Sequence, residues 1–381
     1  MENSKKKNNL MRIIYFFILI ISFPGIVNSQ RARDFGLEIG IFKPGLNNAI
    51  TDVPGVSVGH FTKIEGDTIM TGATAILPHQ ESIFQKKVPA AVYIGNGFGK
   101  LSGISQVKEL GNIETPVVLT NTLSVPTAMN ALISYTLEAE ENHNVRSVNA
   151  LVGETNDGRL NDIRGRHLSE SEILMAIQNA STENADEGNI GAGTGTICFG
   201  FKGGIGTSSR KLPGSMGAYT VGVLVQSNFG GVLEINGIPV AKELGITPYQ
   251  KQIIEDADVS CMIIVITDAP VNERNLERMA KRAMLGLAKT GGIASNGSGD
   301  YVIALSNYEK NLVPYRSENK IEKSEFLRNG EMSPLFLATI EATEEAIINS
   351  LLAAKDVKSN GYEIKALPKN KLRELIMKYR E

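Results

Sequence analysis

Short apolar runs rich in β-branched residues alternate along the chain with longer segments in which hydrophobic residues recur at helical spacing. The short runs predict strands and the helical spacing predicts helices. The predicted strands are Gly72–Leu77, Ala90–Ile94, Val117–Leu119, Tyr219–Val225, Met262–Ile266 and Tyr301–Leu305. The predicted helices are Pro126–Glu141, Ser169–Asn179, Glu273–Lys289 and Pro334–Ala354. This alternation predicts a layered α/β fold rather than an all-helical or all-strand one.

Two helix starts carry local signals. Ser169 is expected to be an N-cap residue, with Glu172 three positions later completing a capping box. Ser333 followed by Pro334 marks another start, because proline is tolerated in the first helical turn. Two polar segments are expected to be surface loops, residues 306–333 and 181–189.

The first 29 residues have the build of a secretory signal peptide. Basic residues precede the apolar run Ile13–Phe23, and small residues at 27–29 follow it. The run is too short to cross a hydrocarbon core about 30 Å thick. The mature protein, beginning at Gln30, is therefore expected in the periplasm or outside the cell, without a membrane anchor.

Composition narrows the classes of function. The chain has 381 residues, of which 42% are hydrophobic, so it has apolar material for a large core and is not a disordered protein. Lys plus Arg total 39 against 41 for Asp plus Glu, and without a basic block this balance gives no support for nucleic-acid binding. Cys198 and Cys261 lack metal-site spacing and are interpreted as buried free thiols, with one disulfide as the alternative.

Common hydrolase and nucleotide-binding signatures are missing. The G-x-S-x-G elbow of α/β-hydrolases is absent as a strand–turn–helix unit, and no metal-ligand spacing joins the histidines, which are His60, His79, His143 and His167. A histidine-based serine triad is therefore not expected. The glycine-rich stretch Gly191–Thr196 lacks the lysine of a P-loop, and it is interpreted as a tight loop against a sheet.

The segment Asn296–Asp300 places a serine between two glycines, directly before a predicted strand. It is either a turn that feeds the strand or a site of self-cleavage. In the second case the Ser298 hydroxyl attacks the carbonyl of Gly297 in an N-to-O acyl shift, and hydrolysis of the ester leaves Ser298 as a new N-terminus. Its α-amine, with an ordinary pKa of roughly 7.7–8.0, can then act as a base at neutral pH without a histidine.

Further motifs follow one another along nearly the whole mature chain. They are Asn48–Val56, Val58–His60, Thr71–Thr74, Leu119–Thr122, Gly153–Asp162, Val225–Gly230, Thr267–Pro270, the segment around Ser298, and Glu341–Ile347. In this order they resemble the DmpA/BapA aminopeptidases, self-processing N-terminal-serine hydrolases that include L-aminopeptidase/D-esterases and β-peptidyl aminopeptidases. The resemblance favours self-cleavage over a simple turn at Ser298.

The resemblance implies a four-layer αββα sandwich similar to that of N-terminal-nucleophile hydrolases. Cleavage between Gly297 and Ser298 would give a large subunit, residues 30–297, and a small subunit, residues 298–381, which stay together. The resemblance also implies a homo-oligomer of such pairs, commonly a homotetramer, and no metal or organic cofactor. The implied substrates are short peptides, amides or esters that lose an N-terminal L-α-, D- or β-amino acid through an acyl-Ser298 intermediate.

Site roles are implied in the same way. Ser298 matches the nucleophile, and Glu154 matches the acidic residue that holds the free amino group of the substrate. Asn228 is the candidate oxyanion donor, since a side-chain amide can bond the tetrahedral intermediate; the alternative is a cap at a strand end. Asn156, also placed in the substrate site, stands where some relatives have tyrosine.

The last long helix adds a hydroxyl and a carboxylate. Spacing puts both Glu341 and Glu344 on or beside its apolar stripe, where a carboxylate is expected to be paired or functional. Periodicity does not choose between them. The resemblance chooses Glu341, together with Thr339, as groups around the nucleophile.

Two other functions compete with an aminopeptidase. An acyltransferase of the ornithine acetyltransferase type shares the self-processing fold, but its nucleophile is normally threonine and export suits arginine biosynthesis badly. An uncleaved, non-catalytic binding protein is the third hypothesis, and the intact segment around Ser298 argues against it.

Overall fold

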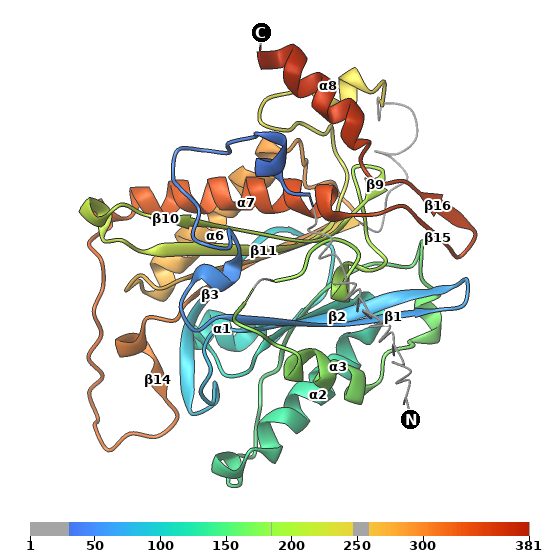
Figure 1. The fold of residues 1–381 in the computed structure, drawn as a ribbon. Coiled ribbons are helices and arrows are strands. Elements are labelled where there is room, and N and C mark those ends of the chain that lie inside the picture. The colour runs from blue at the N-terminus through green and yellow to red at the C-terminus, as the bar shows by residue number, and fades with distance from the viewer. Residues whose placement is uncertain (1–29, 184, 247–258, 381) are drawn as a thin grey trace, which may run out of the picture.

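The computed structural model describes residues 30–183, 185–246 and 259–380, so the predicted signal peptide lies outside the described residues. Two β-sheets lie face to face, and helices cover the outer face of each (Figure 1). This order of layers confirms the predicted αββα sandwich.

The first sheet has five strands in the order β1-β2-β6-β7-β4. Their bounds are Ser57–Glu65 for β1, Ile69–Leu77 for β2, Val117–Asn121 for β6, Leu151–Thr155 for β7 and Leu101–Ser102 for β4. Strands β6 and β7 run parallel, so their carboxyl ends share one edge of the sheet. Helices α2 (Val125–Glu138) and α3 (Glu170–Gln178) cover the outer face.

The second sheet has the order β10-β11-β12-β13-β3-β14, and β5 also pairs with β3. The bounds are Gly204–Lys211 for β10, Thr220–Asn228 for β11, Val259–Thr267 for β12, Ser298–Ser306 for β13, Lys86–Gly97 for β3, Val313–Pro314 for β14 and Asn112–Ile113 for β5. Strand β13 runs parallel to β12 and antiparallel to β3. It is therefore an interior strand, with a backbone ladder on each side.

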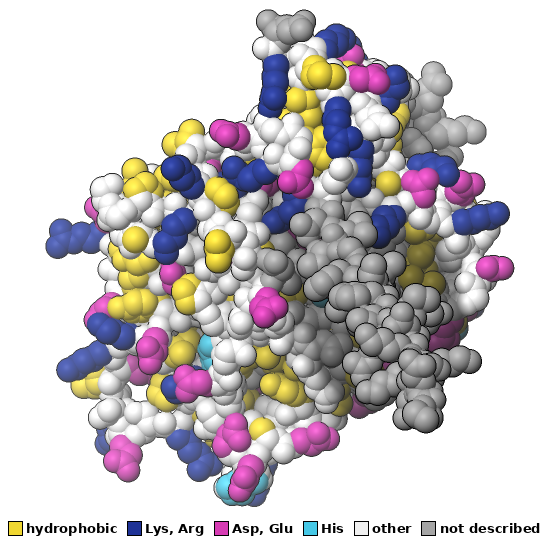
Figure 2. Space-filling model, viewed as in Figure 1, with side chains coloured by type: hydrophobic (Ala, Val, Ile, Leu, Met, Phe, Trp, Pro, Cys, Tyr) yellow, Lys and Arg dark blue, Asp and Glu magenta, His cyan; other side chains and the backbone are white. Residues whose placement is uncertain are grey.

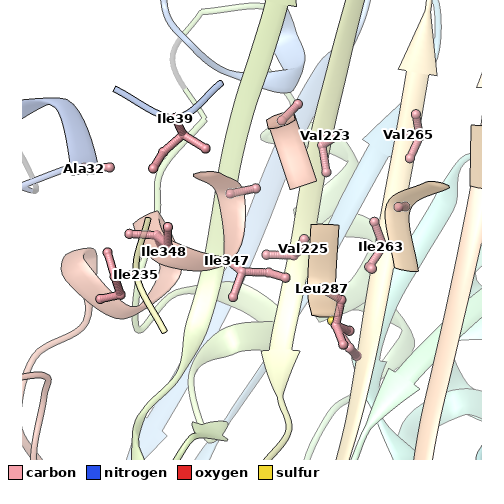
Figure 3. Close-up of a cluster of buried hydrophobic side chains, with 14 of the residues drawn as sticks. Ala32, Ile39, Val223, Val225, Ile235, Ile263, Val265, Leu287, Ile347 and Ile348 are labelled. Atoms are coloured by element: carbon pink, nitrogen blue, oxygen red, sulfur yellow. The ribbon is translucent and has the colours of Figure 1, made fainter. Parts of the chain in front are cut away.

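Alternation along these strands separates two hydrophobic cores. In β12, Ile263 and Val265 face the outer helices α6 (Glu273–Lys289) and α7 (Ser333–Ala353), where they join Leu287 and Ile347 (Figure 3). The intervening residues, such as Ile264, face the other sheet and fill the space between the layers. Both faces of the central strands are buried from solvent, which explains their nearly continuous apolar sequence.

Smaller elements complete the chain. They are α1 (Ile104–Leu110), β8 (Ile197–Cys198), β9 (Phe201–Lys202), α4 (Val240–Glu243), β15 (Val357–Ser359), β16 (Tyr362–Ile364) and α8 (Lys369–Arg380). On the face in Figure 2, acidic and basic side chains are interspersed. In the described part of the chain, every helix is too short or too polar to cross a membrane.

The predicted elements are largely confirmed. Each predicted strand coincides with an observed one, although Tyr219 precedes β11, and each predicted helix is present within three residues of its predicted ends. Ser169 caps α3 in a capping box with Glu172, as expected. Helix α7 begins at Ser333 with Pro334 in its first turn. Residues 306–333 are a largely exposed connection with only short regular pieces.

The interpretations of the two cysteines and of the glycine-rich stretch Gly191–Thr196 are also confirmed. Cys198 and Cys261 are free and fully buried, and burial raises the pKa of the Cys198 thiol to about 12. The glycine-rich stretch packs against β2, where the Ala192 amide donates to Thr74 Oγ1 at 3.0 Å. It is a tight loop on a sheet rather than a nucleotide-binding loop.

Gly206 in β10 shows how closely α7 lies on the second sheet. A Cβ at this position would clash with the carbonyl oxygen of Ala346. We expect Gly206→Ala to lower the free energy of unfolding by about 3 kcal/mol, because helix and sheet must move apart. Gly214→Ala, where a Cβ meets nothing within 4 Å, is the matched control and should change it by less than about 0.5 kcal/mol. Equal stability of the two variants in denaturant unfolding would contradict this packing.

Candidate active site

Ser298 is the first residue of β13, and only 1% of it is exposed. Its amide donates to the carbonyl oxygen of Ser295 at 2.8 Å, which closes a four-residue turn before the strand. Ala294, just before the turn, has a φ of 46°, which is uncommon for a residue with a Cβ. The peptide bond between Gly297 and Ser298 therefore lies where a constrained turn enters an interior strand.

Asn96 on the neighbouring strand β3 holds this turn. Its Nδ2 donates to the carbonyl oxygens of Ser295 at 3.0 Å and Asn296 at 3.3 Å, and also to that of Ser298. The Phe98 amide donates to the same Ser298 oxygen at 3.1 Å. Backbone groups on both sides of the peptide bond are thus fixed from β3.

The Ser298 hydroxyl donates to Asp300 Oδ1 at 2.8 Å. Asp300 is 1% exposed, and its other oxygen, Oδ2, has no hydrogen-bond partner among the described atoms. Burial raises the pKa of Asp300 to about 6, while the hydrogen bond from Ser298 opposes the rise. The sequence analysis missed Asp300. The signal was available, because residues two apart in a strand point to the same face.

Glu154 lies at the carboxyl end of β7 and is 2% exposed. Its carboxylate accepts from the Lys100 amide at 2.8 Å and from the Thr122 hydroxyl. Gly99 separates it from the start of β13, since a Cβ on Gly99 would lie 3.2 Å from both Glu154 Oε1 and the Cα of Gly299. The fold therefore brings Glu154 beside the residue that follows Ser298.

Asn228 is the last residue of β11 and lies at the end of the second sheet where β13 begins. It lies opposite Ser260 of β12, which is in register with Gly299 of β13. With strands about 4.8 Å apart, its backbone is roughly 10 Å from that of Gly299. Asn228 Nδ2 donates to the carbonyl oxygen of Asn156 at 3.0 Å, so these two predicted residues are in direct contact. Asn228 Oδ1 accepts from the Ile197 amide at 2.9 Å.

Thr339 and Glu341 were predicted to lie around the nucleophile, but their hydrogen bonds are to groups other than Ser298. The Thr339 hydroxyl donates to the carbonyl oxygen of Leu335, one turn back in α7, at 2.7 Å. Glu341 accepts from the backbone amides of Ile41 and Phe42 at 2.8 and 3.1 Å. In the described structure neither side chain is bonded to Ser298 or Asp300.

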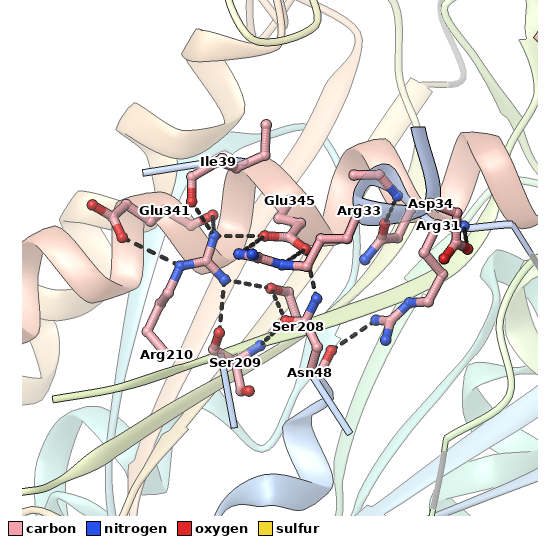
Figure 4. Close-up of polar contacts among 12 residues, drawn as sticks. Arg31, Arg33, Asp34, Ile39, Asn48, Ser208, Ser209, Arg210, Glu341 and Glu345 are labelled. Carbon is pink, nitrogen blue, oxygen red and sulfur yellow. Dashed lines mark hydrogen bonds and ion pairs between the residues drawn. The ribbon is translucent and has the colours of Figure 1, made fainter. Parts of the chain in front are cut away.

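Glu341 belongs instead to a buried ionic network around Arg210, a fully buried residue of β10 (Figure 4). Arg210 pairs with Glu341 at 3.2 Å and with Glu345 at 2.7 Å. Arg33, from the N-terminal segment, donates twice to the same Glu345 carboxylate. The network ties the N-terminal segment, β10 and α7 together.

The histidines do not form a shared site. Each contacts a different partner through a ring nitrogen: His60 contacts the Thr74 hydroxyl, His79 the Lys86 carbonyl oxygen, His143 the Glu140 carbonyl oxygen and His167 the Asp162 carboxylate. Within residues 30–183, 185–246 and 259–380, no group of three His, Cys, Asp or Glu side chains is placed to hold a metal ion.

Comparison with known proteins gives the same family at the level of sequence. Residues 48–364 match the model of peptidase family S58. A beta-peptidyl aminopeptidase, BapA, from Sphingosinicella microcystinivorans is 38% identical over 95% of this chain and 96% of its own.

Solved structures give the same fold. The Burkholderia sp. beta-aminopeptidase superposes with a TM-score of 0.85 at 38% identity, covering 92% of this chain and 99% of its own. The L-aminopeptidase D-Ala-esterase/amidase from Ochrobactrum anthropi superposes with a TM-score of 0.81 at 32% identity, with the same coverage. The latter is described as a prototype of the serine aminopeptidases and as a variant of the Ntn hydrolase fold.

Proposed function

The chain belongs to peptidase family S58 and is a serine-type aminopeptidase, and on this premise we propose that it cuts itself between Gly297 and Ser298 and then releases N-terminal residues through an acyl-Ser298 intermediate. The observation that carries the proposal is the position of Ser298. It is the first residue of an interior strand, behind a turn held from β3. A cut there would leave a nucleophile and its own amine at a fixed point of the sheet.

The proposed mature enzyme uses the α-amine of Ser298 as its base. The amine takes the proton of the hydroxyl as Oγ attacks the substrate carbonyl, and it returns the proton to the leaving amine. Water then hydrolyses the acyl-enzyme with the same amine as base. No histidine is required for these steps.

Glu154 is proposed to bind the ammonium group of the substrate. A buried carboxylate that faces a site favours a cation, and its present donors, the Lys100 amide and the Thr122 hydroxyl, fix its orientation. Because the relative from Sphingosinicella microcystinivorans is named a beta-peptidyl aminopeptidase and that from Burkholderia sp. a beta-aminopeptidase, we propose short peptides and amides with an N-terminal β-amino acid as one substrate class. L-α- and D-residues, and the corresponding esters, remain in the proposed range.

Asn228 is proposed to donate to the oxyanion of the tetrahedral intermediate, with Asn156 holding its amide in place. Loss of such a donor typically costs about 2.7–4 kcal/mol of transition-state stabilisation. The contacts of Thr339 and Glu341 support a positioning role through α7 rather than contact with the reacting atoms.

Export and assembly belong to the same proposal. The build of residues 1–29 supports export to the periplasm or the medium, and the family resemblance supports a homotetramer of processed pairs without a cofactor.

The experiment that tests the proposal is an intact mass of the purified protein with N-terminal sequencing of every chain. Two chains, the smaller beginning at Ser298, would support self-processing. A single unbroken chain that hydrolyses amino-acid amides would contradict it and would require a different nucleophile.

We expect Glu154→Gln to lower kcat/KM for amino-acid p-nitroanilides by roughly 10- to 100-fold, mainly through KM. The amide keeps the shape of the side chain but loses the charge that attracts the ammonium group, a loss typical of a hydrogen bond to a charged group. Steady-state kinetics on the processed variant measures this.

Glu109→Gln, at an exposed position of α1, is the matched control and should leave kcat/KM unchanged. If Glu154→Gln processed normally and kept the KM of the wild type, Glu154 would not be the ammonium site.

A further inference from the structure

We propose that Asp157 is a positioning residue for substrate recognition, and that a chain of hydrogen bonds starting from it orients Glu154. The inference rests on the proposed function, since it takes Glu154 to be the group that binds the ammonium of the substrate. Asp157 lies in the loop after β7, at the edge of the first sheet where the parallel strands β6 and β7 end. Groups at the carboxyl ends of parallel strands are well placed to act on one ligand.

Hydrogen bonds lead from Asp157 to a turn beside Glu154. The Thr71 hydroxyl, on β2, donates to Asp157 Oδ2 at 2.6 Å. Asn121 Nδ2, at the end of β6, donates to the Thr71 hydroxyl at 2.8 Å. Asn121 Oδ1 accepts from two backbone amides of the short 3-10 helix Thr122–Ser124 at 3.1 and 3.0 Å, and it therefore caps this helix.

The capped helix carries a donor to Glu154. Thr122 is its first residue, and the Thr122 hydroxyl donates to Glu154 Oε2. The Lys100 amide donates to Glu154 Oε1 at 2.8 Å. One of the two donors that orient the carboxylate is thus held in place by the bond between Asn121 and Thr71.

The second oxygen of Asp157 also accepts a hydrogen bond. Asn161 Nδ2 donates to Asp157 Oδ1 at 2.9 Å, and Asn161 Oδ1 accepts from the Met70 amide at 3.2 Å. The chain therefore begins and ends at backbone amides, which can only donate. Every bond between them points inward, so the central side chain must accept from both sides. A carboxylate does this, whereas an asparagine has one oxygen that accepts and one nitrogen that donates.

The carboxylate of Asp157 is buried, and both of its side-chain donors are uncharged. Burial raises the pKa of Asp157 to about 7, the bonds from Thr71 and Asn161 oppose the rise, and the charge of Glu154 adds to it. On β9, burial lowers the pKa of Lys202 to about 7, and this lysine donates to backbone carbonyls. Carboxylates are rarely buried without a bonded cation, so a solely structural role is an unusual use of this one.

Protonation of Asp157 would disturb the chain. Below about pH 7 the carboxyl carries a hydrogen, which faces either the Thr71 hydroxyl or the Asn161 amide, both of which are donors. One donor then lacks an acceptor, and the 3-10 helix beside Glu154 is held less firmly. We therefore expect the preference for a substrate ammonium group to be strongest above pH 7.

The test compares two p-nitrophenyl esters, of 3-aminobutanoic acid and of butanoic acid, which differ only in the amino group. The ratio of their kcat/KM values measures recognition of the ammonium group, and a loss shared by both esters cancels. For processed Asp157→Asn we expect this ratio to fall roughly 5- to 30-fold, because the chain loses a hydrogen bond. For the wild type we expect the ratio to fall as the pH is lowered through about 7, and Asp157→Asn should lack this step.

A double variant separates positioning from a general loss of packing. Asp157→Asn combined with Asn161→Asp exchanges the carboxylate and the amide. The carboxylate at position 161 would accept from the Met70 amide and from the amide at position 157, whose oxygen would still accept from Thr71. Every donor again has an acceptor, so most of the wild-type ratio should return. Asp67→Asn, in an exposed turn, is the matched control and should keep the wild-type ratio.

An unchanged ratio in Asp157→Asn, together with a lowered ratio in Glu154→Gln, would overturn this inference and leave the proposed function intact. A folded double variant with no higher ratio than Asp157→Asn would overturn it as well. If the variants at Asp157 fail to fold or to process, a wild-type ratio that does not change between pH 6 and pH 8 would overturn it. Equal kcat/KM values of the wild type for the two esters would overturn both the ammonium site and this inference.

Discussion

Replacing Ser298 with alanine is expected to leave a single uncut chain and to lower peptide and amide hydrolysis by at least about 10⁴-fold. The alanine removes Oγ, the proposed nucleophile of both reactions, and loss of a nucleophile removes nearly all of the catalysis that depends on it. The backbone of β13 and the turn before it do not depend on the hydroxyl, so the variant should fold.

The measurement is an intact mass for processing and release of p-nitroaniline for hydrolysis. Ser295→Ala is the matched control, because Ser295 contributes its carbonyl oxygen to the same turn. It should process and hydrolyse nearly as the wild type does. If Ser298→Ala were cut at the same bond, an external protease would be responsible, and residual hydrolysis near the wild-type rate would exclude Ser298 as the nucleophile.

The second large effect is expected on stability. We expect Arg210→Met to lower the free energy of unfolding by about 3–5 kcal/mol, because it leaves the buried carboxylate of Glu341 without its cation and leaves Glu345 with Arg33 alone. Arg210 also donates to the carbonyl oxygen of Ile39 at 2.7 Å, so the N-terminal segment would lose an anchor on β10. Denaturant unfolding measures the change.

Arg164→Met provides the matched control, since Arg164 is exposed, and it should change stability by less than about 0.5 kcal/mol. Adding Glu341→Gln to Arg210→Met should recover part of the loss, because it removes the charge that Arg210→Met leaves without a cation. A loss below about 1 kcal/mol for Arg210→Met would mean that water or another cation reaches the carboxylates.

The layers of the fold could be predicted because burial on both faces leaves strands such as β12 and β13 almost wholly apolar. Strand β10 was not predicted, because its sequence is polar rather than apolar. Its residues Thr207, Ser208, Ser209 and Arg210 are polar and yet buried, since their partners come from distant parts of the chain. Periodicity of hydrophobic residues does not reveal a strand whose inward face is satisfied by hydrogen bonds.

Site residues that are close together in the sequence could be predicted, whereas contacts between residues far apart in the sequence could not. The serine between two glycines marks Ser298, and the same short segment contains Asp300. The partners of Glu341 were not predictable, because Arg210 lies 131 residues away and the Ile41 amide 300 residues away. Spacing on α7 predicted that Glu341 is either paired or functional; the structure shows it paired, and only the folded chain shows with which groups.

The interior position of β13 has a consequence for how the protein is made. A cut before Ser298 would leave the central strand of the second sheet on a separate polypeptide, paired on both sides with strands of the other chain. Folding of the newly made chain is a first-order event, whereas recovery of the cut protein from the unfolded state would be second order and would slow with dilution. The mature enzyme would therefore persist because it unfolds slowly, and not because it refolds.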